Sequence, residues 1–115
     1  MKTPFVSVLF FLVASFFGAA GQFLYKSGAD RTTRSLASYV LNAWILGGVV
    51  CYIAVMALFV AAFKRGGALS VLYPVYATTF IWAAVISLWA YSTPIKAVNV
   101  LGMVLLIAGM FLMGK

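Results

Sequence analysis

The chain has 115 residues, of which 66% are hydrophobic and 8% are charged, with 8 lysines and arginines against one acidic residue. A soluble domain carries charged residues at about a quarter of its positions, so this chain lacks the polar surface that water requires, and lipid must be its solvent. The cations are dispersed singly or in pairs, which excludes the basic stripe with interleaved aromatics of a nucleic-acid-binding protein. We predict an integral membrane protein that binds no nucleic acid.

The reactive side chains that are present also limit the functions that are possible. The chain has no histidine, and Asp30 is its single carboxylate side chain. General acid–base catalysis, Ser-His-Asp chemistry and metal coordination depend on groups that are missing here. Cys51 stands in an apolar run without a second cysteine, so we expect a small buried side chain and no disulfide. The sequence therefore predicts a protein that is not an enzyme and that holds no metal or cofactor.

The first apolar segment extends over residues 4–26. Its small residues at 18–21 follow a hydrophobic run, as at the cleavage site of a signal peptide. The run continues to Tyr25, however, and reaches the length of a membrane span, which favours a retained first helix. Gly28, in the polar stretch that follows, is expected to stop this helix.

Three further apolar segments follow, over residues 39–63, 69–91 and 95–113. Each of the four is about 20 residues long, which is the length that spans a hydrocarbon core of roughly 30 Å. A membrane β-barrel is excluded because it needs alternating polarity and many more segments. Pro74 lies near the start of the third segment, where its missing N–H donor is expected to kink the helix. The sequence predicts one all-α domain over residues 1–115, a bundle of four transmembrane helices.

The distribution of cations favours neither orientation in the membrane. Four spans place both termini on one side, and the cations divide equally between the two sides. An equal division is expected of a subunit that inserts in both directions and pairs antiparallel, but a partner subunit or a weak bias would also fix one orientation, and both readings stay open. The terminal side has Lys2, Lys64, Arg65 and Lys115, and the other side has Lys26, Arg31, Arg34 and Lys96.

One arc of the first helix is polar or small, since a period of 3.6 residues aligns Ser15, Gly18, Gln22 and Lys26. An unpaired buried amide costs about 2 to 7 kcal/mol, so Gln22 must face a substrate cavity or a neighbouring helix. Lys26 either extends to the lipid headgroups or meets a phosphate within a cavity. We treat the four as candidate substrate-binding residues. Arg31 and Arg34, in the following loop, could form the outer rim of such an anion site, but we expect them to be solvated charges.

The third and fourth segments add two further pairs of candidate residues. Tyr73 and Tyr76 share a face of the third helix, which either lines an amphipathic cavity beside Gln22 or packs against another helix. Gly102 and Gly109 lie two turns apart on one face of the last helix, where small residues let backbones approach closely. We expect the glycines to form a dimer interface, with packing inside the bundle as the alternative.

These features together resemble the small multidrug resistance (SMR) family of the drug/metabolite transporter superfamily. Lys26 closes the first helix as in many members, and residues 102–109 resemble the glycine motif through which members dimerise. The resemblance implies an SMR-like four-helix fold and an antiparallel dimer. Drug-exporting members have a membrane-buried glutamate in the first helix, where this chain has Gly18. That departure argues against proton-coupled export of organic cations or guanidinium.

The aminoarabinose–phosphoundecaprenol flippase subunits, which lack that glutamate, are more similar. Residues 20–26 resemble their first-helix pattern, and residues 73–76, 80–82 and 88–89 resemble their third-helix pattern. Those proteins often have an acidic residue before the proline of the last connection, where this chain has Ser92 and Thr93. This difference weakens the assignment to the same substrate.

Residue chemistry and resemblance together predict a multi-pass transporter subunit of the bacterial cytoplasmic (inner) membrane. Its substrate would be a polyprenyl-phosphate-linked sugar, or a similar anionic lipid, that is flipped by two inverted subunits. Lys26 would pair with the phosphate and Gln22 would hydrogen-bond the headgroup, in a homodimer or a heterodimer with a similar small subunit. A small multidrug or metabolite exporter with another coupling residue, an accessory subunit of a heteromeric transporter and a membrane scaffold are the alternatives.

Overall fold

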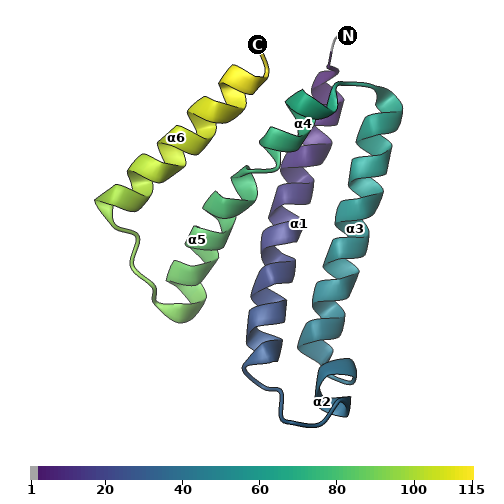
Figure 1. The fold of residues 1–115 in the computed structure, drawn as a ribbon, viewed down its shortest axis with the longest axis vertical. Helices are drawn as coiled ribbons and strands as arrows, with labels where there is room; N and C mark the ends of the chain where they lie inside the picture. Colours follow the sequence, from purple (N-terminus) through teal and green to yellow (C-terminus); the bar gives the residue numbers. More distant parts are fainter. Residues whose placement is uncertain (1–2) are drawn as a thin grey trace.

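The computed structural model describes residues 3–115, and every regular element in that range is an α-helix. In chain order the helices are α1 (Phe5–Ala29), α2 (Ala37–Val40), α3 (Ala43–Arg65), α4 (Leu69–Val75), α5 (Thr78–Tyr91) and α6 (Ala97–Met113). The long helices α1 and α3 run side by side, and α6 lies at the opposite edge beside α4 and α5 (Figure 1). α1 therefore occupies the centre of the molecule, between α3 and α5.

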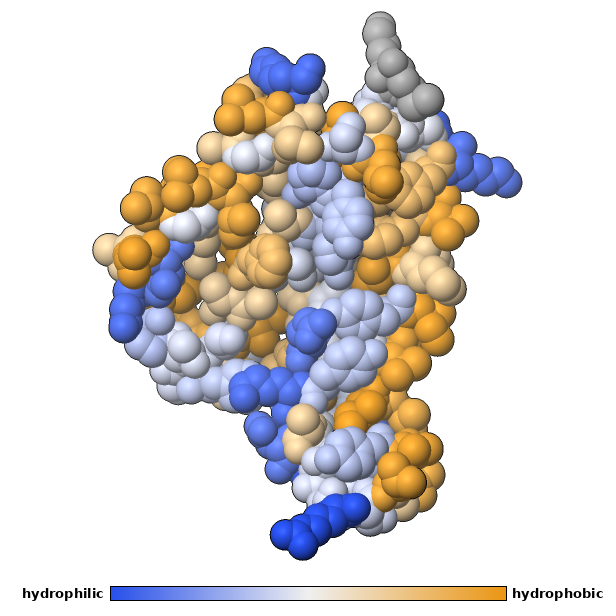
Figure 2. Space-filling model, viewed as in Figure 1, coloured by the Kyte–Doolittle hydropathy of each residue, from blue (hydrophilic) through white to orange (hydrophobic). Residues whose placement is uncertain are grey.

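Three stretches of helix are long and apolar enough to cross a membrane, namely α1, α3 and the α4–α5 pair over Leu69–Tyr91. α6 is also apolar, but its 17 residues extend only about 25 Å, less than a hydrocarbon core of roughly 30 Å. Large hydrophobic side chains are exposed on all of these helices, and Figure 2 shows apolar residues covering α3. The chain is a multi-pass, all-α membrane protein, and a fourth span at α6 stays a prediction.

Most buried residues belong to α1, which has nine of them, whereas neither α5 nor α6 has any. Phe11 of α1 is fully buried with Ala62 of α3 and Leu72 of α4, and its ring stacks on Phe59 at 4.4 Å between ring centres. Ser7 of α1 is also fully buried, and its hydroxyl donates a hydrogen bond to the Ala62 carbonyl oxygen at 2.9 Å. The core thus joins α1, α3 and α4 near the end at which α1 begins.

Glycines bring α1 and α3 into close contact along the rest of their length. A Cβ added to Gly48 of α3 would lie 2.5 Å from the ring of Tyr25 and 3.1 Å from the carbonyl oxygen of Gly21. A Cβ added to Gly21 would lie 2.7 Å from the ring of Tyr52. The two tyrosine rings stack on each other with centres 5.4 Å apart. In a membrane the hydrophobic effect does not drive helices together, so they commonly associate through close backbone approach at small residues.

The expectation that Gly28 stops the first helix is wrong, because α1 continues through it to Ala29. Gly28 is buried against α3, and a Cβ there would lie 2.6 Å from the Ile45 side chain. Asn42 caps α3, since its side-chain oxygen accepts from the Trp44 N–H at 3.0 Å, and its amide donates to the Gly28 carbonyl at 2.8 Å. Glycine is therefore needed at position 28 because a larger side chain would collide with α3.

The expected distortion at Pro74 is confirmed and takes the form of a break. α4 ends at Val75, and two residues follow before α5 begins at Thr78. Proline lacks an N–H donor, and its ring clashes with the preceding helical turn. The break lies where the Tyr76 hydroxyl reaches α1 beside Gly18, so it positions one of the candidate residues.

α6 has no buried residue, and its main contacts are with α4 and α5. A Cβ added to Gly102 or Gly109 would meet no atom within 4 Å. Neither glycine is therefore required for packing within this chain. Their role in a dimer interface stays a prediction.

The cations lie near opposite ends of the α1–α3 pair. Lys64 and Arg65 form the last turn of α3, at the end where α1 begins, and Lys26 is in the last turn of α1 (Figure 1). Lys2, which we counted with the first group, lies outside the described residues. The orientation of the chain in the membrane thus stays open.

Candidate functional site

The polar arc of α1 contacts α3 and α5 at successive helical turns. Ser15 is fully buried, and its hydroxyl accepts a hydrogen bond from Thr78 of α5 at 2.7 Å. One turn further, Gly18 leaves room for the hydroxyl of Tyr76, which a Cβ at that position would overlap. The Gly18 carbonyl also accepts a hydrogen bond from Tyr52 of α3 at 3.3 Å. Ser15 and Gly18 thus hold α1 against α3 and α5, and direct contact with a substrate stays a prediction for both.

Gln22 is exposed on the membrane-length helix α1. Its side-chain amide donates a hydrogen bond to the Tyr52 hydroxyl at 2.5 Å. A glutamine side chain has two N–H donors and an oxygen with two lone pairs, so this contact uses one of its four bonding positions. Hydrocarbon offers no partner for the others. Gln22 therefore needs a further polar contact from a substrate, water or a partner subunit.

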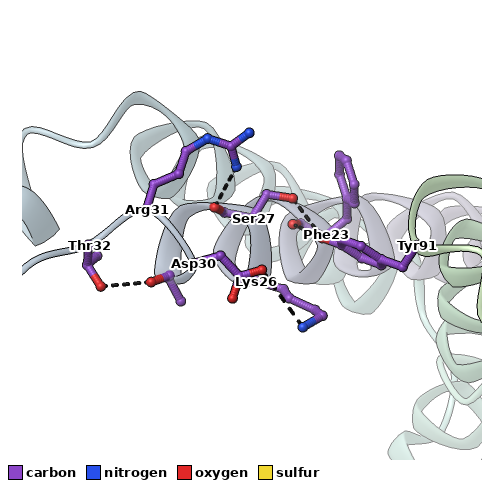
Figure 3. Close-up of polar contacts among 8 residues, drawn as sticks. Phe23, Lys26, Ser27, Asp30, Arg31, Thr32 and Tyr91 are labelled. Carbon is purple, nitrogen blue, oxygen red and sulfur yellow. Dashed lines mark hydrogen bonds and ion pairs between the residues drawn. The ribbon is translucent and has the colours of Figure 1, made fainter.

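Lys26 lies one turn beyond Gln22, and 59% of its side chain is exposed. Its ammonium group is 4.0 Å from the carboxylate of Asp30 and 5.1 Å from the centre of the Tyr91 ring (Figure 3). An exposed ion pair of this kind contributes little to stability and is easily exchanged. Lys26 is thus a cation at the end of a membrane helix that is free to pair with an incoming anion.

A cavity of about 90 Å³ lies between α1 and α5, with both Gln22 and Lys26 in its wall. A water molecule occupies about 30 Å³ of liquid, so the cavity accommodates a few waters. A second cavity of about 480 Å³ shares Phe23 and Tyr91 with it. The two cavities are therefore neighbours, and the larger one lies where the loop after α1 begins.

Tyr73 and Tyr76 do not line the cavity beside Gln22 and Lys26. Their rings pack edge to face, with centres 6.3 Å apart, and the ring of Phe59 lies against both. Tyr76 contacts α1 at Gly18, which is about 12 Å along the helix axis from Lys26. Within this chain the tyrosines and the lysine are thus separate, and a single substrate cavity that contains all of them stays a prediction.

One residue of the site, Tyr52, was missed by sequence reasoning. Tyr52 partners both Gln22 and the Gly18 carbonyl, and the signal was a phenol in an apolar run, whose hydroxyl needs a polar partner in hydrocarbon. Arg31 is exposed, as expected, but it isn't a freely solvated charge. Its guanidinium lies 4.4 Å from the centre of the Trp44 ring and donates a hydrogen bond to a backbone carbonyl of α1 at 2.8 Å.

No group of three or more histidine, cysteine, aspartate or glutamate side chains is arranged to hold a metal ion within residues 3–115. An amide, two cations, one carboxylate and a set of aromatic rings line two adjacent cavities at one end of a helix bundle. The cations suit an anionic ligand.

The chain was compared with known proteins. No family model matches it, and neither does any solved structure. A curated relative from Erwinia tasmaniensis is 28% identical over 110 residues, which cover 96% of this chain and 98% of the relative. That protein is named as a probable 4-amino-4-deoxy-L-arabinose-phosphoundecaprenol flippase subunit, ArnE. The similarity thus extends over nearly the whole chain, and it confirms the resemblance that the motifs of the first and third helices indicate.

Proposed function

We propose that this chain, which is similar to a flippase subunit over almost its entire length, is a subunit of a lipid transporter. Its substrate is a polyprenyl-phosphate-linked sugar, or a similar anionic lipid, and the membrane is the bacterial cytoplasmic membrane. The full-length similarity carries the proposal. The polar groups on membrane-length helices support it, because polar side chains are costly in hydrocarbon and usually mark a functional site.

Each polar residue has a distinct part in this proposal. Lys26 pairs with the phosphate, for which it exchanges its exposed contact with Asp30. Gln22 uses its remaining hydrogen-bonding positions on the headgroup, while the Tyr52 hydroxyl keeps its amide in place. The long apolar chain of the lipid stays in the bilayer, so only the headgroup crosses between the helices.

The transporter contains a second small subunit, which is either another copy of this chain or a similar protein. The relative is itself named as a subunit. Gly102 and Gly109 present an open, small-residue face on α6, at which another helix can approach closely. The equal division of cations between the two sides suits an antiparallel pair, in which inverted subunits rock about the substrate.

A translocation assay tests the proposed function. The purified complex, with any second small protein that native mass spectrometry identifies in it, is reconstituted into vesicles that contain a fluorescent polyprenyl-phosphate-linked pentose. A membrane-impermeant reductant then reports how fast the inner-leaflet lipid reaches the outside. We expect a rate above that of protein-free vesicles, and a fall of at least about tenfold for Lys26→Ala, since a hydrogen bond to a charged group contributes roughly 1.5 to 3 kcal/mol.

Lys64→Ala is the matched control, because it removes a cation from the last turn of α3, near the other end of the bundle. Its rate should equal that of the unmodified protein. A folded complex that moves the lipid no faster than protein-free vesicles would contradict the proposal. Equal rates for Lys26→Ala and Lys64→Ala would contradict the role of Lys26.

A further inference from the structure

The larger of the two adjacent cavities combines aromatic side chains with an arginine. It measures about 480 Å³ and lies at the end of α1, where the loop to α2 begins and α5 ends. Four of its lining residues are aromatic, and two are charged. The lining residues that matter here are Phe23, Asp30, Arg31, Trp44, Trp89 and Tyr91.

Arg31 is held in place in this cavity. Its guanidinium lies 4.4 Å from the centre of the Trp44 ring. It also donates a hydrogen bond to the Ser27 carbonyl oxygen at 2.8 Å (Figure 3). A guanidinium has five N–H donors, so most of them remain available after this single bond. Stacking on an aromatic face orients the plane of the group, and a planar fork of donors matches two oxygens of one phosphate.

The local charge favours an anion. Asp30 is the chain's single acidic side chain, and it lies 4.0 Å from the ammonium of Lys26. Asp30 also lines this cavity, so the charged groups at this end of the bundle are two cations, Lys26 and Arg31, against one carboxylate. The excess of positive charge favours an anion.

Aromatic rings form much of the cavity wall. The ring of Phe23 lies 6.2 Å from that of Trp44, 6.5 Å from that of Trp89 and 5.8 Å from that of Tyr91, measured between ring centres. Tyr91 is fixed at this place by a hydrogen bond of 2.7 Å between its hydroxyl and that of Ser27. Trp89 is 80% exposed, so its large ring is available to a ligand. An aromatic belt explains a tryptophan near a helix end, but it does not explain one that shares a cavity with an oriented arginine.

We propose that this cavity is a vestibule that captures the headgroup of a lipid in which a phosphate joins a sugar to the apolar chain. Arg31 binds the phosphate and Trp89 packs on the apolar face of the sugar ring. The headgroup then passes Phe23 and Tyr91, which belong to both cavities, to reach Lys26 and Gln22. The inference rests on the proposed function, because it specifies the substrate class and the first contact of the same transport path.

Binding to the full protein complex in lipid nanodiscs, measured by native mass spectrometry, tests the vestibule. The probes are farnesyl phosphate and the same lipid with a pentose on its phosphate. We expect Arg31→Gln to weaken the binding of both lipids about 10- to 100-fold, since it removes charge-assisted hydrogen bonds to the phosphate. Trp89→Leu should weaken only the pentose-bearing lipid, by about 3- to 10-fold, because its ring contacts the sugar.

Matched variants separate these roles from general effects. Arg34→Gln removes an exposed cation from the same loop, and Trp89→Phe keeps an aromatic ring at the same position. Both should bind within about twofold of the unmodified protein. Because Arg31 and Trp89 are exposed, their substitution leaves the helix contacts intact, and a circular dichroism spectrum checks this.

Several results would overturn the vestibule. These are unchanged binding in Arg31→Gln, equal weakening of both lipids in Trp89→Leu, or competition by a soluble pentose phosphate as strong as that by the lipid. If the unmodified protein translocates the fluorescent lipid while both variants bind and transport normally, the vestibule is refuted but the proposed function is not. If the predicted binding pattern is found but no lipid is moved, the binding site is supported and the proposed transport function is refuted.

Discussion

Substitution of Gly48 by alanine should destabilise the contact between α1 and α3. The added methyl group would lie 2.5 Å from one ring carbon of Tyr25 and 2.6 Å from another, and 3.1 Å from the carbonyl oxygen of Gly21. Carbon atoms in contact are normally about 3.5 to 4.0 Å apart, so the ring must move by about 1 Å. It cannot do so freely, because the ring is also stacked on Tyr52.

The magnitude follows from two opposing effects. Overpacking of this kind costs about 1 to 3 kcal/mol, while replacement of a mid-helix glycine by alanine gains about 1 kcal/mol in helix propensity. Gly102→Ala supplies the matched comparison in the monomeric subunit, since a methyl group there meets no atom of this chain within 4 Å and only the gain in propensity applies. The free energy of unfolding of Gly48→Ala should therefore be about 1 to 3 kcal/mol below that of Gly102→Ala.

Equilibrium unfolding of the detergent-solubilised protein by sodium dodecyl sulfate, followed by far-ultraviolet circular dichroism, measures this difference. The comparison of two glycine-to-alanine variants removes the uncertainty in helix propensity. If Gly48→Ala were as stable as Gly102→Ala, the inferred close contact between α1 and α3 would be refuted.

Asn42→Ala removes both the α3 cap and the hydrogen bond to the Gly28 carbonyl. The same titration should therefore show a free energy of unfolding lower by about 1 to 2 kcal/mol, and an unchanged midpoint would exclude the cap. Tyr52→Phe removes the hydroxyl that accepts a hydrogen bond from Gln22. We expect slower lipid translocation, with unchanged binding of the phosphate lipid at the vestibule. A normal translocation rate would show that this contact is dispensable. Gly109→Leu should leave the unfolding of the isolated subunit unchanged but abolish its dimer in native mass spectrometry, and a persistent dimer would place the interface elsewhere.

The candidate site shows where sequence reasoning reaches its limit. Periodicity correctly grouped Gln22 and Lys26 on one side of α1, because the helix itself sets the relation between residues four apart. It did not identify Tyr52 as their neighbour. Tyr52 is 30 residues from Gln22 in sequence, and which tyrosine meets the amide depends on the glycine contacts that set the register of α1 against α3.

The sequence by itself determined that the chain is an all-α membrane protein with spans at the places where α1, α3 and α4–α5 occur. Hydropathy is a property of each residue and needs no knowledge of its neighbours. The tertiary structure decided that Gly28 continues a helix, that Arg31 is held over Trp44, and that α6 has no buried residue. These features arise from contacts between segments distant in the chain, and such contacts depend on the shapes of both partners rather than on the polarity of either.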